Sequence, residues 1–229
     1  MIDKQALIQA DRGQPAAAIR LVDKAGFPAW LASLTPGQRS AVEAQKFAGA
    51  GYEHAIVPEG DGWSAVGGVA DVAALSSWCL ARLAERLPPG TYRLGGEAGR
   101  ADAGKALLGW VTAQYRFARY KPAADAPSGP RVLLTSEVKA IAPVLNEAAA
   151  VGWVRDLVNT PAQDMGPAEL EDEVRRLGER HKARVTVASG DALARDYPLV
   201  HAVGRAAERA KKLEAEREKG LLGLGRSKE

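Results

Sequence analysis

The sequence has little of several features that identify a protein class at once. It holds one cysteine, Cys79, which excludes an internal disulfide framework and fits a reducing compartment. No apolar run approaches the roughly 20 residues that span a bilayer. The N-terminus lacks the apolar core of a secretory signal, so we expect a cytoplasmic protein without a membrane segment. The three histidines, His54, His181 and His201, are far apart and none lies in a HExxH or CxxC-type setting, so they predict no zinc site.

An excess of one charge is also absent from most of the chain. The net charge of +3 is carried by residues 205–229, and residues 1–204 are formally neutral. A phosphate-binding face normally shows Lys and Arg clustered on the folded domain, so nucleic-acid binding is not expected. What the chain does have is an apolar content of 46 % and 229 residues, enough for one large globular domain or two small ones.

Strand and helix patterns alternate along the first part of the chain. The predicted strands are 18–23, 54–58, 63–69, 91–94 and 131–135, and the predicted helices are 27–34, 35–47, 73–87 and 102–119. Residues 59–62 have the composition of a hairpin turn, residues 121–130 that of an exposed loop, and residues 1–15 show no clear period. This alternation predicts an α/β fold whose mixed or mostly parallel sheet is flanked by helices.

A long helix follows. Apolar residues recur at three- to four-residue steps, which predicts one apolar helix face: Ile141, Val144, Leu145, Ala148, Val151, Val154, Leu157 and Val158. Asn159-Thr160-Pro161 ends this helix, because the residue before a proline is pushed out of the α region. Gly166-Pro167 starts the next helix, which runs to His181. A strand at 184–188 and a short helix at 191–195 are predicted beyond it.

Three blocks of the chain resemble the leucyl (cytosol) aminopeptidase family. They are Arg155–Pro161, Asp164–Pro167 and His201–Arg205, with weaker similarity at 109–110, 115–117 and 119–121. The resemblance covers about residues 15–205. It implies a macro-domain-like N-terminal domain at 1–137, a connecting helix at 138–160, and an incomplete start of the catalytic α/β domain at 161–205. The charged tail, 206–229, does not resemble the strands that begin there in the family; our hypothesis for it is a frameshift, a premature stop or a fragmentary gene model.

The resemblance implies release of N-terminal residues from peptides by water activated between two divalent metals, zinc or manganese, usually in a hexamer. In the family the metal ligands lie in two later motifs, Gly-Lys-Gly followed by Phe-Asp and Asn-Thr-Asp-Ala-Glu-Gly-Arg. Neither motif occurs in this sequence, and Asn159-Thr160 is followed by Pro161. We therefore assign no catalytic, metal-binding or cofactor-binding residue and predict that this chain alone is inactive. The alternative is a binding or oligomerisation module, for a nucleotide-type ligand, for DNA, or for assembly with full-length subunits.

Other residues that bear chemistry have plainer interpretations. The acidic group Glu169, Glu171, Asp172 and Glu173 favours the positive end of a helix, and His181 the negative end. Cys79 is expected to be a buried small apolar side chain, and the serines at 64, 76 and 77 have no histidine pattern nearby. Helix packing is expected over base stacking for the aromatic and basic residues Trp110, Tyr115, Arg116, Phe117, Arg119, Tyr120 and Lys121. Gly220, Gly223 and Gly225 follow no strand, which argues against a phosphate loop.

Overall fold

The computed structural model describes residues 7–95, 103–120 and 129–205. The chain divides into two compact units, residues 1–156 (unit 1) and residues 157–229 (unit 2). The division falls near the end of the long helix α5, Val138–Asn159. The finer boundaries predicted from the sequence, at 137, 160 and 205, stay predictions. Among the described residues, no helix has the length and apolar character needed to cross a membrane.

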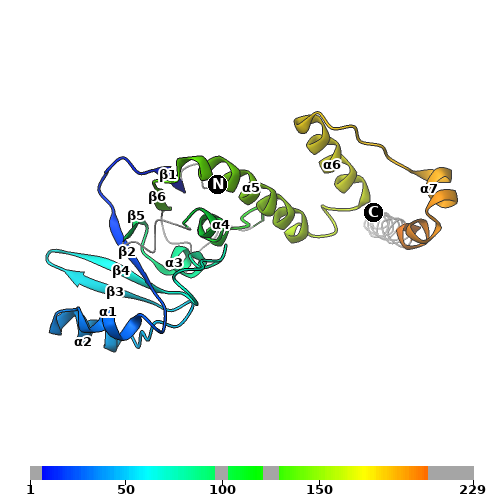
Figure 1. Cartoon of the computed structure of the whole chain (residues 1–229). Coiled ribbons are helices and arrows are strands. Elements are labelled where there is room, and N and C mark those ends of the chain that lie inside the picture. The colour runs from blue at the N-terminus through cyan, green and yellow to red at the C-terminus, as the bar shows by residue number, and fades with distance from the viewer. Residues whose placement is uncertain (1–6, 96–102, 121–128, 206–229) are drawn as a thin grey trace, which may run out of the picture. The chain divides into compact units, whose positions relative to one another are not determined.

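Unit 1 is built on one six-stranded sheet (Figure 1). In spatial order its strands are β1 (Ile8–Ala10), β6 (Arg131–Thr135), β5 (Gly90–Gly95), β2 (Ala17–Val22), β4 (Gly62–Gly68) and β3 (His54–Glu59). The neighbours pair in parallel except β3 and β4, which form the predicted hairpin. The α/β fold with a mixed sheet flanked by helices is therefore confirmed.

Strand β1 was not predicted, because residues 1–15 show no clear period. Residue Ile8 nevertheless pairs with Leu133 at the edge of the sheet, and Leu7 and Ile8 are buried. A strand of three residues is too short to show a two-residue alternation. Strand β1 is recognised only from its pairing with β6 and from the packing of Leu7 and Ile8 in the larger apolar cluster.

The helices of unit 1 are α1 (Phe27–Ala32), α2 (Pro36–Ala44), α3 (Ala81–Arg86), α4 (Ala103–Ala113) and most of α5. The prediction of a helix from 73 to 87 is wrong over its first half, because residues 73–76 are bends and irregular chain and residues 77–80 form a turn. There the Ser77 carbonyl accepts a hydrogen bond from the Gly109 amide at 2.7 Å, and the Ser76 hydroxyl accepts one from the Trp78 amide at 3.3 Å. Backbone groups engaged in this way are not available for a helix. Leu75 is still buried, which is why the spacing looked helical.

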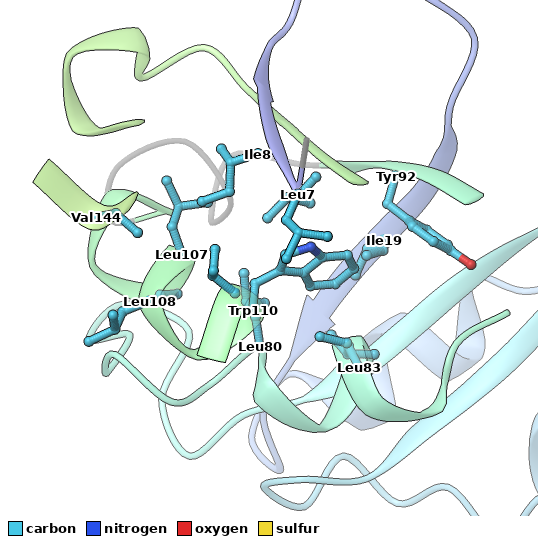
Figure 2. Packing of buried hydrophobic residues seen from close by; sticks show 14 of the residues in the cluster. Leu7, Ile8, Ile19, Leu80, Leu83, Tyr92, Leu107, Leu108, Trp110 and Val144 are labelled. Carbon is cyan, nitrogen blue, oxygen red and sulfur yellow. The ribbon is translucent and has the colours of Figure 1, made fainter. Parts of the chain in front are cut away.

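Two apolar clusters lie on opposite faces of the sheet. The larger one joins the sheet to α3, α4 and α5 and is centred on Trp110, whose ring meets Tyr92 edge to face at 5.7 Å between centroids (Figure 2). The indole Nε1 of Trp110 donates to the Arg131 carbonyl at 2.9 Å. The smaller cluster lies under α1 and α2 and contains Val22, Trp30, Val42, Phe47, Ala55, Val57 and Val66. Unit 1 therefore has the helix–sheet–helix layering of an α/β domain.

The edge strand β3 is covered by side chains of α2 and of Gln45, the residue that follows it. The side-chain Nε2 of Gln45 donates to the Ile56 carbonyl at 2.7 Å, and its Oε1 accepts from the backbone amide of Ile56 at 2.8 Å. Gln38 donates to the Pro58 carbonyl at 2.9 Å. These side chains bond the backbone groups that an edge strand otherwise offers to another strand, so they protect this edge from pairing.

Helix α5 ends before Thr160-Pro161, as predicted. Its predicted apolar face is only partly correct, because Val144 and Ala148 are buried while Val154 and Val158 are 50 % and 78 % exposed. The first half of the helix packs on the core of unit 1. The apolar period predicts the helix, but only the tertiary packing determines which of its apolar side chains are buried.

The described part of unit 2 consists of helices and connections. Helix α6 (Pro167–His181) starts at Gly166-Pro167 as predicted, helix α7 (Gly190–Asp196) also matches its prediction, and residues 198–205 are helical. The strand predicted at 184–188 is wrong. Val185 lies against Gly178, where an added Cβ would come within 2.4 Å of its Cγ2 atom. A strand needs a neighbour for its backbone groups, and the described residues of unit 2 contain no strand to pair with.

Candidate functional site

A hollow of about 300 Å³ lies in unit 1 at the C-terminal end of α4. It is lined by Trp78, Ala81, Glu85, Thr112, Ala113, Tyr115, Arg116 and Arg155. It combines two aromatic side chains with two arginines, the composition of a site for an anionic or planar ligand. Whether the hollow can bind such a ligand depends on whether the two arginines are already engaged in hydrogen bonds.

Arg155, from the first block of the family resemblance, holds the end of α4. Its Nη1 atom donates to the Thr112 carbonyl at 2.7 Å, and its guanidinium carbon lies 5.5 Å from the centre of the Tyr115 ring. The Tyr115 hydroxyl in turn donates to Oδ1 of Asp156 at 2.6 Å. Two consecutive residues of the block, Arg155 and Asp156, thus fasten α5 to the residues that end α4.

Arg116 completes this arrangement. Its Nη1 atom donates to the carbonyls of Ala113 and Tyr115 at 2.9 and 2.8 Å. The last carbonyls of a helix have no partner within the helix and carry the negative end of its dipole. Arg155 stabilises the Thr112 carbonyl in this way, and Arg116 stabilises the Ala113 carbonyl. The same bonds explain why α4 ends at Ala113 and not near Arg119, as the sequence predicted. We interpret the group of Arg116, Tyr115, Arg155 and Asp156, the α4–α5 clamp, as a structural joint.

The histidines are placed on separate elements. His54 begins β3 and is partly buried; burial lowers its pKa from the usual 6.5, and the nearby Arg82 and Arg86 lower it further. His181 is the last residue of α6 and is exposed, at the end of the helix where the dipole favours a cation. His201 lies in the helical residues 198–205. A metal-binding role is supported for none of the three.

A metal pair does not fit the side chains that the structure describes. In residues 7–95, 103–120 and 129–205 there is no group of three or more His, Cys, Asp or Glu side chains close enough to hold a metal ion. Two-metal hydrolysis needs several carboxylates that converge on both ions. The statement that the whole chain lacks such a site remains a prediction from its sequence.

The acidic residues at the start of α6 have structural partners. Glu169 accepts a hydrogen bond from the Gly166 amide at 2.9 Å, which caps the helix. Glu171 binds Arg175 at 2.7 Å, and Glu173 pairs with Arg176. The predicted helix-dipole interpretation applies to Glu169, which lies in the first turn, whereas Glu171 and Glu173 lie further along α6 and form ion pairs instead.

The remaining candidates also have local partners. The Ser64 hydroxyl donates to Oε1 of Glu59 at 2.5 Å, and the Cys79 sulfur accepts from the Ser76 amide at 3.2 Å. Trp110 is fully buried, so it offers no surface for stacking a base. Phe117 and Tyr120 contact each other at 5.9 Å between ring centroids, and Arg119 lies 5.5 Å from the Tyr120 ring. Lys121 and the glycines at 220, 223 and 225 lie outside the described residues.

Sequence reasoning missed the role of two carboxylate side chains. Asp156 belongs to the family-like block, yet only the fold brings it to Tyr115 across 41 positions of the chain. Glu137 lies before α5, and its Oε2 atom accepts from the Gly104 amide at 3.1 Å, near the start of α4, where a negative charge is favourable. Arg155 and Asp156 are the only charged residues from Ala148 to Asn159, and this pair was a signal in the sequence that pointed to the clamp.

Comparison with known proteins gives a consistent result for the N-terminal part. Residues 17–128 match the family model of the M17 aminopeptidase N-terminal domain. A probable cytosol aminopeptidase of Rhodococcus opacus is 30 % identical over 127 residues, which are 49 % of this chain and 25 % of that protein. Peptidase B of Cronobacter sakazakii is 38 % identical over 69 residues, which are 28 % of this chain and 16 % of that protein.

Two solved structures extend the comparison. The cytosol aminopeptidase of Coxiella burnetii is similar with a TM-score of 0.71 and 27 % identity, over 87 % of this chain and 43 % of that one. The bottromycin maturation enzyme BotP in complex with Mn shares the fold, with a TM-score of 0.58 and 20 % identity over 83 % of this chain and 40 % of that one. The chain spans about a quarter of the length of the curated cytosol aminopeptidase that it matches. Residues 17–128 are therefore similar to the M17 aminopeptidase N-terminal domain, in agreement with the resemblance to the leucyl (cytosol) aminopeptidase family.

Proposed function

We propose that this chain supplies the N-terminal domain and the beginning of the catalytic domain of a metal-dependent aminopeptidase that acts on peptides in the cytoplasm. The observation that carries the proposal is the similarity to the Coxiella burnetii cytosol aminopeptidase over 87 % of the chain. The matched share of the chain exceeds the share that residues 1–156 of unit 1 represent, so the match includes residues of unit 2. The names of the Rhodococcus and Coxiella relatives support both the reaction and the compartment.

In this proposal the residues of this chain have a structural role and do not supply the metal ligands of the reaction. When bound, a metal pair activates water and polarises the peptide carbonyl. The sequence contains neither motif that carries the ligands in the family, and the described side chains do not converge on a metal site. The α4–α5 clamp, by contrast, joins Arg155 and Asp156 of α5 to Thr112 and Tyr115 within unit 1. In this proposal the clamp holds the chain where it leaves the N-terminal domain, and the chain alone releases no amino acid.

An assay of peptide hydrolysis tests the proposal. Purified chain is incubated with leucine-p-nitroanilide and Mn²⁺ or Zn²⁺, next to the Coxiella burnetii enzyme as a positive control. We expect no turnover above buffer from the chain and clear turnover from the control. Turnover that co-purifies with the chain, disappears on chelation and returns with metal would contradict the proposed inactivity.

The family resemblance also leads us to propose that the chain joins a homo-oligomer. Light scattering after size exclusion measures this directly. A mass corresponding to several copies supports the assembly, and a monomer at every concentration tested counts against it.

A further inference from the structure

The hollow at the C-terminal end of α4 is lined by side chains of both charges. Helix α3 and the turn before it contribute Trp78, Ala81 and Glu85. The residues that end α4 contribute Arg116, and α5 contributes Arg155. Helices α3 and α4 lie side by side (Figure 1), and every lining residue belongs to unit 1. The hollow is therefore formed within one compact unit.

The α4–α5 clamp uses only one nitrogen of each guanidinium group. The hydrogen bonds that Arg116 and Arg155 make with other described residues all start from Nη1. A guanidinium group carries further N–H donors in the same plane, and its Nε–Nη2 edge can bond both oxygens of a carboxylate. Because the clamp does not use that edge, either arginine can bind a carboxylate and keep its bonds to the α4 carbonyls.

Glu85 contributes the negative charge of the lining. Its Oε2 atom pairs with Arg82 at 3.4 Å, and the two side chains are 44 % and 39 % exposed. An exposed ion pair of this kind is weak, since water competes for both charges. Glu85 can therefore accept hydrogen bonds from the ammonium group of a ligand in the hollow.

Trp78 contributes an apolar surface. The residue lines the hollow and is 45 % exposed. A flat apolar group stacks favourably on an indole ring in an offset or edge-to-face arrangement. The volume of about 300 Å³ lies at the lower end of the range for ligand pockets, which indicates a small occupant.

We propose that this hollow binds a free α-amino acid with a flat apolar side chain, of which phenylalanine is the simplest. Its carboxylate bonds the Nε–Nη2 edge of Arg116, its ammonium group bonds Glu85, and its ring stacks on Trp78. A simple organic anion would leave the Glu85 carboxylate beside it without a ligand partner, and a neutral ligand would use none of the charges. The inference goes beyond the proposed function and does not depend on it.

Isothermal titration calorimetry of the full chain with three probes tests the inference. The probes are L-phenylalanine, 3-phenylpropionate, which lacks the ammonium group, and phenethylamine, which lacks the carboxylate. We expect L-phenylalanine to bind one molecule per chain. Each analogue loses one charged contact and should bind at least about tenfold more weakly.

Two substitutions assign the charged contacts. Glu85→Gln should weaken L-phenylalanine at least about tenfold and leave 3-phenylpropionate unchanged. Arg116→Gln should weaken both of these probes and leave phenethylamine unchanged, because only the carboxylate contact is lost. The glutamine amide can still donate to the Ala113 carbonyl, so we expect the variant to fold.

The matched control is Arg39→Gln. Arg39 also bonds carbonyls at a helix end, those of Ala32 and Leu34 at 3.4 and 3.5 Å, but it does not line the hollow. This variant should bind all three probes like the unaltered chain. Circular dichroism checks the fold of each variant, and if Arg116→Gln unfolds, Glu85→Gln at its exposed helix position decides the question.

Three results would overturn the inference. The first is no heat of binding from L-phenylalanine at millimolar concentrations. The second is an analogue that binds as tightly as L-phenylalanine. The third is binding of L-phenylalanine that neither Glu85→Gln nor Trp78→Ala weakens.

Discussion

Units 1 and 2 use apolar residues in opposite ways. Every buried hydrophobic side chain in the described residues lies between Leu7 and Ala148, whereas none lies in residues 157–205. Both regions contain helices with apolar residues at helical spacing. Among the described residues, only those of unit 1 form a sheet, whose two faces give the helices a surface to cover. The difference teaches that an apolar period predicts a helix but does not predict that its apolar face is buried.

The largest expected contrast comes from truncating one apolar side chain in each unit. Trp110→Ala removes a fully buried indole and its hydrogen bond to the Arg131 carbonyl, so it should lower the free energy of unfolding by about 3–5 kcal/mol. Leu170→Ala in α6 removes a side chain that is 45 % exposed and should cost less than about 1 kcal/mol. Urea unfolding followed by circular dichroism measures both. Equal losses would show that unit 2 has a core of its own.

Glycines within helices sharpen the comparison. An added Cβ at Gly109 in α4 would lie 2.5 Å from the Ser77 carbonyl oxygen, whereas one at Gly204 would meet no atom within 4 Å. Gly109→Ala should therefore destabilise unit 1 by about 1–3 kcal/mol. Gly204→Ala should instead raise local helix stability by up to about 1 kcal/mol. Thermal unfolding and hydrogen exchange over residues 198–205 check the two effects, and a neutral Gly109→Ala would refute the close approach.

The α4–α5 clamp provides a third comparison, between two arginines. Arg155→Ala leaves the Thr112 carbonyl without its charged donor and should cost about 1–2 kcal/mol in the stability of unit 1. Arg175→Ala removes an exposed ion pair with Glu171 and should cost less than about 0.5 kcal/mol. Chemical denaturation measures both variants. If the two losses were equal, Arg155 would be no more than a surface charge.

The smallest expected effect is a pH dependence confined to unit 1. A hydrogen bond from Arg93, followed by one from the Gly13 amide, lowers the pKa of Asp11 from 3.8 to about 2. Because the folded pKa is depressed, the stabilisation is complete above about pH 4 and is lost as the pH falls toward 2. Asp11→Asn should flatten the acid limb of the stability profile. The control for loss of one negative charge is Asp172→Asn in α6, and an identical change in both profiles would contradict the role of the Arg93 pair.

Several parts of the fold were predictable because their signals are local. The hairpin of β3 and β4 was predicted from the turn composition of residues 59–62. The helix predicted to start at residue 35 is α2, and Thr35 caps it. The end of α5 before Pro161 was predicted from the restriction that proline imposes. In each case one or two residues limit the backbone, whatever surrounds them.

Other predictions failed where the outcome depends on distant partners. Residues 73–80 have helical spacing, but the bond between Gly109 and Ser77 crosses to another segment of the chain. Residues 184–188 have a strand-like composition, yet the described part of unit 2 offers them no neighbouring strand. β1 needs β6, which lies more than 100 positions later, to become a strand at all.

By itself, the sequence determined the order of the principal elements, the neutrality of residues 1–204, and the similarity of its N-terminal part to leucyl aminopeptidases. Turn chemistry, proline restriction and apolar period act within a few residues, so they can be read directly from the chain. Only the tertiary structure decided that Arg155 and Asp156 form a joint with α4 and that the apolar side chains of α6 stay exposed. Burial and hydrogen bonding between distant residues depend on which surfaces meet, and that is a property of the folded chain.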